Sequence, residues 1–552
     1  MSKWLTIAAV ALITVGAFAF REPKLTLRVF HQDEAIHCYR LEEIREEHVY
    51  KYIPSEYHGP TLNYFTFPVL WLTGANNWFA ATEWHYRMVT VLFGTALVLS
   101  VLLLRDGVGN VATVFAALLT AVSPAMVFYS RYYIQEMLLV FFMAMAIGAA
   151  WRWSRSGRWG WLVILGAAIG FMHATKETFI INLFAAAAGM AGAWVMTRGV
   201  RPSGLLRPST WLIPLYTAVI VSAILFSSFF HYWRGVLDSI LTYKVYFSRG
   251  AGVNTDHVHP WWYYFQLFFW YQIGRAPVRT EMAIPALALV GFVYALWPRR
   301  HAQVPLPVGE ARGEGSDQSP PTDTAARLFL LRWLAIYTLV LTAVYCRISY
   351  KTPWCALGFL HGMILLAGVG AAAIIRAGRL VPVQVCLAVI LLLPVGYLPG
   401  KQRRYWQGYA LAAQAYDLSY VRPHVANSDF NPYVYGHTSA KVLELVERVE
   451  EISRVWPAHD GISIQVTTND CWPTPWYLRQ YLNARFPGKR PFVSPELLIA
   501  NADKNELPLP ADLEDKYKAD YFGLRRQELL VLYVRNDVWA KFIESRARPA
   551  RR

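Results

Sequence analysis

Long apolar runs recur through the first 400 residues of this 552-residue chain, and they limit what it can fold into. A helix that crosses a bilayer needs about 20 mostly apolar residues. About 11 runs meet or approach that length: residues 4–20, 86–104, 111–128, 134–150, 161–173, 179–196, 211–230, 282–297, 328–346, 354–375 and 381–398. The sequence therefore predicts a mainly α-helical, multi-pass membrane protein. The first run also fits a cleaved signal peptide, because Lys3 precedes a short apolar stretch.

The composition agrees with the membrane class and excludes others. Charged residues make up 16% of the chain, against about 25% in soluble proteins, which excludes an ordinary soluble enzyme and a disordered chain. The net charge of +16 does not point to nucleic acid as a partner, because membrane proteins accumulate Lys and Arg in cytoplasmic loops. The five cysteines contain no CxxC pair, so we interpret them as isolated thiols, with a single external pair as the alternative.

The distribution of arginines predicts the orientation. With a cytoplasmic N-terminus, every predicted cytoplasmic loop carries arginine, as the positive-inside rule requires; these residues are Arg105, Arg152, Arg155, Arg158, Arg198, Arg201, Arg207, Arg299, Arg300, Arg312, Arg327, Arg376 and Arg379. We therefore expect a plasma (inner) membrane protein with external loops at 21–85 and 231–281. The latter is rich in aromatics and should carry interfacial helices. Residues 298–327, rich in Pro, Gly and Ser, predict a disordered cytoplasmic linker.

Beyond the transmembrane domain predicted for residues 1–400, the composition changes. Charges and turn residues become frequent in 401–552, so this part should form a small extracytoplasmic α/β domain. We expect β-structure at 432–436, 462–466 and 529–534. Thr438 or Ser439 should cap a helix with apolar positions from Val442 to Ile452, and Asp470 should cap a second helix containing Trp476.

An acidic pair follows the first apolar run, in the stretch "HQDEAIH" that contains Asp33 and Glu34. Adjacent carboxylates in a partly buried loop disfavour double ionisation, so the pKa of one should rise. Such a carboxylate suits a general base that takes a proton from a hydroxyl. The alternative is a solvated acidic turn. Further along the loop, His58 begins "HGP" before an aromatic segment, which predicts a re-entrant or interfacial helix or an ordinary interfacial loop.

The other ionisable residues near span ends are expected on the external side as well. Arg131 and Glu136 open the fourth span, Lys176 lies in a short turn, and Arg347 and Lys351 lie in another. Cations at the membrane surface suit a lipid phosphate, and ordinary headgroup contact is the alternative. Glu136 could pair with Arg131 or with another cation. The histidines at 257 and 259 are too few to predict a metal site.

Four motifs in their order along the chain resemble the GT-C superfamily of polyprenyl-phosphate-dependent glycosyltransferases, which includes protein O-mannosyltransferases and aminoarabinose transferases. They are "HQDEAIH", "EYHGPTLNYF", "SRYYIQEMLL" and "SYKTPW". The chain resembles more closely the flippase activity-associated membrane proteins of that superfamily, whose pattern extends to "NPYVYGHTS" and "CWPTPWYLR" in the C-terminal part.

The resemblance implies a mechanism. Asp33 would be the base and Glu34 its helper, while His58, Arg131, Glu136, Lys176, Arg347 and Lys351 would bind substrate or its phosphate. The donor would be a polyprenyl-phosphate-linked sugar and the acceptor a glycan or protein hydroxyl, attacked with inversion of the anomeric carbon. Some relatives use a divalent metal ion, and no residue here is assigned as its ligand.

Two other functions remain open at the level of the sequence. The chain could be a flippase, or a flippase-associated protein, that binds or moves a lipid-linked sugar without chemistry. Transporter folds often show paired halves with broken helices, and no internal repeat is evident here. The chain could also be an assembly component whose external domain binds partners.

Overall fold

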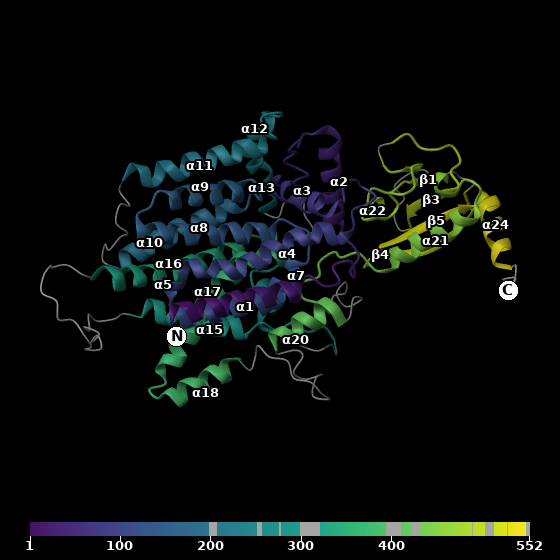
Figure 1. Cartoon of the computed structure of the whole chain (residues 1–552). Helices are drawn as coiled ribbons and strands as arrows, with labels where there is room; N and C mark the ends of the chain where they lie inside the picture. Colours follow the sequence, from purple (N-terminus) through teal and green to yellow (C-terminus); the bar gives the residue numbers. More distant parts are fainter. Residues whose placement is uncertain are drawn as a thin grey trace, which may run out of the picture.

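The computed structural model describes residues 1–197, 207–250, 257–274, 276, 278–297, 321–392, 410–421, 430–487, 489–502, 513–526 and 528–547. A bundle of long helices forms the larger part, and a small sheet with its helices lies beyond one end of the bundle (Figure 1). The long bundle helices are α1 (Lys3–Arg21), α4 (Glu83–Ser100), α6 (Asn110–Val122), α8 (Glu136–Ser156), α9 (Gly160–His173), α10 (Phe179–Met196), α11 (Pro208–Phe226), α15 (Ala283–Leu296), α16 (Pro321–Arg347), α17 (Leu357–Ala377) and α18 (Val381–Leu392). Shorter helical turns extend them: η1 (Val101–Leu104), α5 (Arg105–Val108), α7 (Pro124–Ser130) and η2 (Pro353–Ala356).

The protein is a multi-pass membrane protein. Among the described residues, seven helices are long and apolar enough to cross a bilayer, and counting the bent pair α6 and α7 as one span gives eight. That pair bends by 57° at Ser123, whose side chain accepts from the Met126 N–H while Pro124 begins the next helix. The shorter apolar helices α9, α15 and α18 coincide with further predicted spans. The predicted runs thus fall on helices, except that 393–398 lies outside the described residues.

Small residues let the bundle helices approach closely. A Cβ at Gly291 of α15 would collide with the Leu366 carbonyl of α17, and one at Gly370 would collide with the Leu287 carbonyl. Such small-residue contacts are how helices pack in lipid, where apolar side chains gain little from leaving the solvent. Membrane packing therefore explains these two glycines.

The predicted cytoplasmic and external loops lie at opposite ends of the bundle (Figure 1). Contacts at the end that carries the N-terminus are Asn110 to the Met1 carbonyl, Arg152 to Asp106, and Arg327 to the Gly107 carbonyl. Contacts at the other end are Arg87 to Glu34, Lys176 to Glu136, and His58 to Glu177. This separation is what the predicted topology requires. Which end faces the cytosol stays a prediction.

Short helices cover the end of the bundle that carries the predicted external loops. The first loop forms α2 (Gln32–Glu47) and α3 (Thr61–Thr73), and the long aromatic loop forms α12 (Arg234–Leu241), α13 (Tyr243–Gly250) and α14 (Tyr263–Phe269). After α18, the described chain resumes with α20 (Leu411–Tyr416) and the turn η4 (Asp417–Val421). The helix expected after "HGP" is therefore present as α3, and the helices expected in the 231–281 loop are present too.

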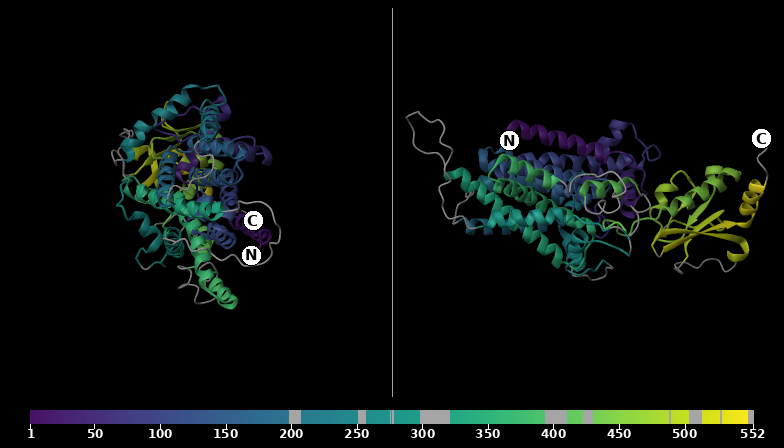
Figure 2. Two further views of the ribbon diagram at one scale, coloured as in Figure 1. Left: turned by 90° about the vertical axis from the view of Figure 1, so that its left-hand side faces the viewer. Right: turned by 90° about the horizontal axis from the view of Figure 1, so that it is seen from below.

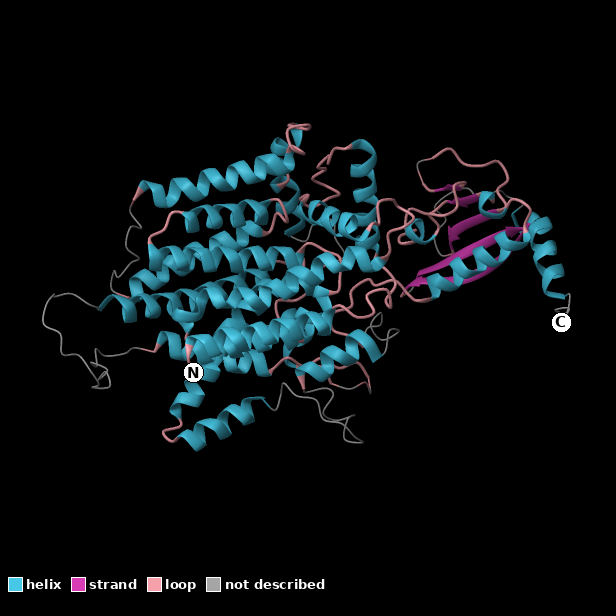
Figure 3. Cartoon of the chain, in the orientation of Figure 1, coloured by secondary structure: helices cyan, strands magenta, loops and turns pink. Residues whose placement is uncertain are grey.

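The C-terminal part holds a five-stranded sheet of order β2-β1-β3-β5-β4. Its strands are β1 (Ile464–Val466), β2 (Ala484–Arg485), β3 (Leu497–Asn501), β4 (Tyr517–Arg525) and β5 (Glu528–Arg535). β1 runs parallel to β2 and β3, whereas β5 runs antiparallel to β3 and β4. The accompanying helices are α21 (Lys441–Val455), η5 (His459–Gly461), α22 (Thr474–Tyr477), α23 (Leu513–Lys516) and α24 (Asn536–Ala547). Figure 3 draws the strands of this sheet in magenta, beyond the end of the helical bundle. The predicted fold class is confirmed.

The sheet has its own apolar core, to which the membrane part contributes. Ile464, Leu497 and Leu532 are fully buried in it, together with Val442 and Val449 of α21. Val29, from the loop after α1, belongs to the same cluster. The right-hand view of Figure 2 shows the sheet region placed beyond the bundle along its long axis. The apolar side chain at Val29 thus links the first external loop to the C-terminal core.

Several local expectations are wrong. Residues 432–436 form turns rather than a strand, because Asn431 and His437 side chains accept from the backbone N–H groups of Tyr433 and Tyr435. The helix expected after Asp470 is the single turn α22, flanked by Pro473 and containing Pro475, which lack an N–H donor. The predicted linker overlaps α16, which begins at Pro321; residues 298–320 and the predicted boundary at 400 lie outside the described residues.

Candidate functional site

The start of α2 holds Asp33 at the surface. His31 Nδ1 accepts from the Asp33 N–H at 3.0 Å, and Glu34 Oε2 accepts from the His31 N–H at 3.0 Å. This reciprocal capping satisfies two of the helix's first N–H groups. The Asp33 side chain is 36% exposed, with its Oδ2 3.6 Å from His31 Nδ1. Because Nδ1 accepts a hydrogen bond, its lone pair is occupied, and the Asp33 carboxylate stays available at the surface.

Glu34 faces the opposite way and is fully buried. Arg87 of α4 donates to both of its carboxylate oxygens at 2.7 Å, and the Tyr133 N–H donates to Oε1 at 2.9 Å. Burial alone would raise the pKa of Glu34, but the Arg87 guanidinium holds it below its ordinary value. The expectation that the acidic pair raises a pKa is thus wrong for Glu34. Its position favours a structural contact rather than help in proton transfer.

Glu136 and Lys176 form a buried ion pair between the start of α8 and the turn after α9. Glu136 thus pairs with another cation rather than with Arg131, one of the two alternatives left open by the sequence. Burial alone would lower the pKa of Lys176, but the Glu136 carboxylate raises it above its ordinary value. Both residues line a cavity of about 310 Å³, part of it open to solvent, together with Asn182, Tyr345 and Trp354.

His58 is tied to the same turn through Glu177. Its Nδ1 lies 2.8 Å from Glu177 Oε2 and 3.0 Å from the Tyr246 hydroxyl, and the Tyr52 hydroxyl donates to Glu177 at 2.6 Å. Burial would raise the pKa of Glu177, but His58 lowers it to about 2. A Cβ at Gly59 would collide with the Ala174 carbonyl oxygen. The glycine of "HGP" therefore lets this loop lie directly against the Lys176 turn.

The turn after α16 separates Arg347 from Lys351. Arg347 is exposed, whereas Lys351 is 1% exposed and its Nζ donates to the carbonyls of His259 and Ile348. Burial lowers the pKa of Lys351. No carboxylate among the described residues forms an ion pair with this ammonium group to oppose the effect. Arg347 is therefore the cation of this turn whose side chain reaches solvent.

His37 lies within range of the charges of three predicted site residues. It lies one helical turn after Asp33 on α2 and is 7% exposed. Burial lowers its pKa to about 4, and the charges of Asp33, His58 and Lys176 all act on it. These three candidates therefore lie within electrostatic range of one buried imidazole. Sequence analysis placed His37 beside the acidic pair but gave it no role.

Arg131 lies apart from these residues. Its guanidinium donates to the carbonyls of Arg21, Pro23 and Lys24 and to the Tyr420 hydroxyl. It lines a second cavity, described below, and not the Glu136–Lys176 cavity. The structure thus does not bring Arg131 to the other phosphate-binding candidates.

The segment 431–437 of the C-terminal part lies against the start of α2. The Tyr435 carbonyl lies 3.1 Å from His31 Nε2, and the His437 ring lies 4.8 Å from that of His31. The Tyr435 hydroxyl contacts His257 Nδ1 at 2.6 Å and His259 Nε2 at 3.2 Å. In the sequence, "NPYVYGHTS" pointed only to the family resemblance. Its run of aromatic and histidine side chains was the signal for a buried contact.

Arg87 is the other residue that sequence analysis missed. It stands at the second position of the predicted span 86–104, and an ionisable residue inside an apolar run marks a functional or structural contact. No group of three or more His, Cys, Asp or Glu side chains in the described ranges is placed to hold a metal ion.

Comparisons with known proteins agree on one fold. A family model described as dolichyl-phosphate-mannose-protein mannosyltransferase matches residues 66–230. The structure of ArnT from Cupriavidus metallidurans bound to undecaprenyl phosphate is 14% identical with a TM-score of 0.60, covering 95% of this chain and 97% of that one. No curated protein sequence matches.

A second fold relative comes from an archaeon. The Archaeoglobus fulgidus oligosaccharyltransferase AglB, in complex with an inhibitory peptide and a dolichol-phosphate, is 13% identical with a TM-score of 0.50. The match covers 87% of this chain and 64% of that one. The resemblance to the GT-C superfamily is therefore confirmed at the level of the fold, which this chain shares with ArnT and AglB.

Proposed function

We propose that the protein transfers a sugar from a polyprenyl-phosphate-linked donor to an acceptor hydroxyl on the extracytoplasmic side of the membrane. The observation that carries this proposal is the exposed Asp33 carboxylate beside a buried, charge-paired Glu34. Support comes from the fold relatives, whose structures hold undecaprenyl phosphate or dolichol-phosphate. The acceptor is a glycan or a protein, and membrane lipids surround the donor site.

In this mechanism Asp33 accepts the proton of the acceptor hydroxyl. The acceptor oxygen attacks the anomeric carbon, and the bond from that carbon to the phosphate oxygen breaks with inversion. The phosphate leaves on its polyprenyl chain with the bonding electron pair. A carboxylate at a solvent-reachable helix start suits this role, because the base must meet the substrate and later release its proton.

Cations stabilise the negative charge that grows on the leaving phosphate. Arg347 is exposed and Lys176 lines the Glu136–Lys176 cavity, so these two are the phosphate contacts in our proposal. Lys351 holds two carbonyls and positions the Arg347 turn, while His58 and Glu177 position the Lys176 turn. Glu34 positions Asp33 through the capping contacts at His31.

The test is transfer by the purified full-length protein in nanodiscs. The donor is undecaprenyl-phosphate-[14C]mannose, or the aminoarabinose analogue, and the acceptor is a cell-envelope glycan and protein extract. Asp33→Asn should lower the rate about 10²–10⁴-fold, with thermal stability unchanged. The matched control is Glu46→Gln, which removes an exposed carboxylate from the same helix.

Full transfer by Asp33→Asn would remove Asp33 as the base. A wild type that transfers no sugar from either donor, yet moves the labelled lipid between leaflets of proteoliposomes, would instead identify a flippase.

A further inference from the structure

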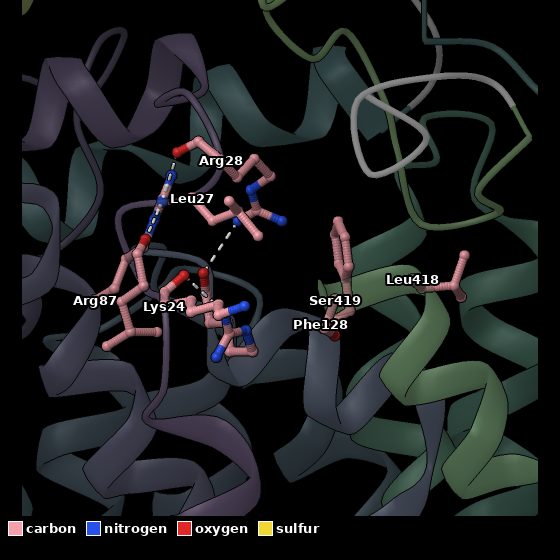
Figure 4. Close-up of a pocket in the computed structure, with 9 residues that line it drawn as sticks. Lys24, Leu27, Arg28, Arg87, Phe128, Leu418 and Ser419 are labelled. Carbon is pink, nitrogen blue, oxygen red and sulfur yellow. Dashed lines mark hydrogen bonds between the residues drawn. The ribbon is translucent and has the colours of Figure 1, made fainter. Parts of the chain in front are cut away.

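A cationic cavity lies apart from the Glu136–Lys176 cavity, where the loop after α1, the end of α7 and the η4 turn meet (Figure 4). It measures about 330 Å³, part of it open to solvent. Four of its nine lining residues are cations, namely Lys24, Arg28, Arg87 and Arg131, and none of the nine is acidic. Figure 4 shows Arg28 and Lys24 on one side and Phe128 and Ser419 on the other, and the Arg28 guanidinium reaches across to lie 4.6 Å from the centre of the Phe128 ring.

These cations have too few carboxylate partners among the described residues. Arg87 donates hydrogen bonds to both carboxylate oxygens of Glu34, while Arg28 Nη2 lies 3.9 Å from one of those oxygens. Arg131 donates to carbonyls and to a tyrosine hydroxyl. Lys24 is exposed. Glu34 therefore serves two guanidinium groups, and Glu22 acts on Arg131 from outside the lining, so the lining itself keeps a positive excess.

Two buried polar atoms at this cavity lack a hydrogen-bond partner in the part of the chain that the structure describes. They are Arg28 Nε and Ser419 Oγ, which come from opposite walls. Arg28 is 9% exposed. Its guanidinium makes cation–π contacts with the rings of Phe128 and Tyr132, which fix it in place. Buried donors without partners are rare in native proteins and call for a ligand or water.

The lowered pKa values of the two arginines also favour an anion in this cavity. Burial, helped by the neighbouring Arg87 guanidinium and opposed by Glu34, lowers the pKa of Arg28 to about 10. Burial likewise lowers the pKa of Arg131 to about 10, although the Tyr420 side chain opposes this. An anion in the cavity would reverse these shifts, since an opposite charge favours the charged form.

We propose that this cavity binds a phosphate-class anion, held by Arg28, Lys24 and Ser419 and by the field of Arg131. Guanidinium, ammonium and hydroxyl donors converging from two walls match the several oxygens of a phosphate. The site is separate from the groups proposed for transfer, because Asp33 and Lys176 do not line it, although its Arg87 also holds Glu34.

The phosphate could belong to a lipid headgroup or be free in solution. α1 ends at Arg21, next to the cavity loop, and exposes Leu12, Val15 and Phe18 along its length. Only 17% of its apolar window is buried, so it faces the acyl chains. A lipid lying along α1 would therefore bring its phosphate to the height of Lys24 and Arg28.

The experiment measures both sources with full-length protein. Equilibrium dialysis of [33P]phosphate against protein in phosphatidylcholine nanodiscs tests the free anion. Native mass spectrometry after exchange into mixed phosphatidylcholine and phosphatidylglycerol tests the lipid. The variants are Arg28→Gln, Ser419→Ala and Lys24→Asn; Asn suits the last position because Lys24 has a φ of 54°. Lys51→Asn, at another exposed lysine, is the matched control.

We expect Arg28→Gln to weaken binding about 10-fold or more, because it removes a charge-assisted donor. Ser419→Ala and Lys24→Asn should each weaken it about 2–10-fold, and Lys51→Asn should not. Binding in either arm that these variants weaken supports the site and identifies its source. Absence of binding in both arms, or equal binding by the wild type, Ser419→Ala and Lys24→Asn, would overturn the proposal even if Arg28→Gln fails to fold.

Discussion

The Arg87 guanidinium donates two 2.7 Å hydrogen bonds to the buried Glu34 carboxylate, one residue after the exposed Asp33. The two adjacent acids therefore have different environments. Glu34 joins α2 to α4 and, through its contact with the His31 N–H, fixes the backbone at the start of α2. Asp33 has its position set by that anchor while its own side chain stays accessible.

Glu34→Gln should therefore destabilise the protein far more than Asp33→Asn. The glutamine leaves the Arg87 guanidinium buried without a counter-charge, which costs about 3–5 kcal/mol when a buried pair is broken. Asp33→Asn changes an exposed group and should stay within about 0.5 kcal/mol. Thermal unfolding in a single detergent checks this. Equal losses of stability in the two variants would contradict the anchoring role of Glu34.

The Glu136–Lys176 pair should show energetic coupling. Glu136→Leu and Lys176→Met each leave one charge buried, so each should cost about 3–5 kcal/mol. The double variant removes both charges and should cost much less than the sum of the two, because no buried charge is left without a partner. A double-mutant cycle in thermal or denaturant unfolding measures the difference. Additive losses would mean that the two side chains do not interact in the membrane.

The membrane part could be predicted from the sequence because lipid enforces a simple rule. Every backbone group in the bilayer must bond internally, so apolar runs become helices. The runs at 4–20 and 179–196 accordingly coincide with α1 and α10. The C-terminal part was harder, since short strands depend on partners that are distant in sequence; β5 was anticipated, whereas β3 and β4 were not.

The positions of the candidate residues could be anticipated from the sequence, but the pairs that they form could not. The predicted arrangement of spans and loops put Asp33, His58 and Lys176 on the same side of the membrane, and in the structure all three charges act on the His37 imidazole. Sequence could not show that Lys176 pairs with Glu136, or that Arg131 faces another cavity, because those outcomes depend on helix rotation and loop packing. Such contacts join residues that lie tens of positions apart in the chain.

Gly59→Ala should disturb both stability and transfer. The new methyl group would meet the Ala174 carbonyl oxygen, so the loop must move away from the turn. That movement would break the hydrogen bond from the Thr61 N–H to Ala174, 3.1 Å long, and the His58–Glu177 contact. We expect a loss of about 1–3 kcal/mol and a lower transfer rate.

Gly16→Ala, on α1, is the control for that experiment, since no atom lies within 4 Å of the added carbon. Wild-type behaviour of Gly59→Ala in both unfolding and transfer would show that the loop does not need this close approach.

Stability should fall as the pH drops from about 6.5 to about 4, because His37 is buried in its neutral form. Burial lowers the pKa of His37 from 6.5 to about 4. Between these values the unfolded chain binds a proton that the folded chain does not, so the free energy of unfolding rises with pH. The contribution is fully present above pH 6.5 and amounts to about 3 kcal/mol.

Unfolding of His37→Gln against pH should show a shallower dependence than the wild type, whereas His48→Asn, at an exposed position of the same loop, should keep the wild-type slope. A pH profile of His37→Gln parallel to the wild type would show that this imidazole is not held neutral by the fold.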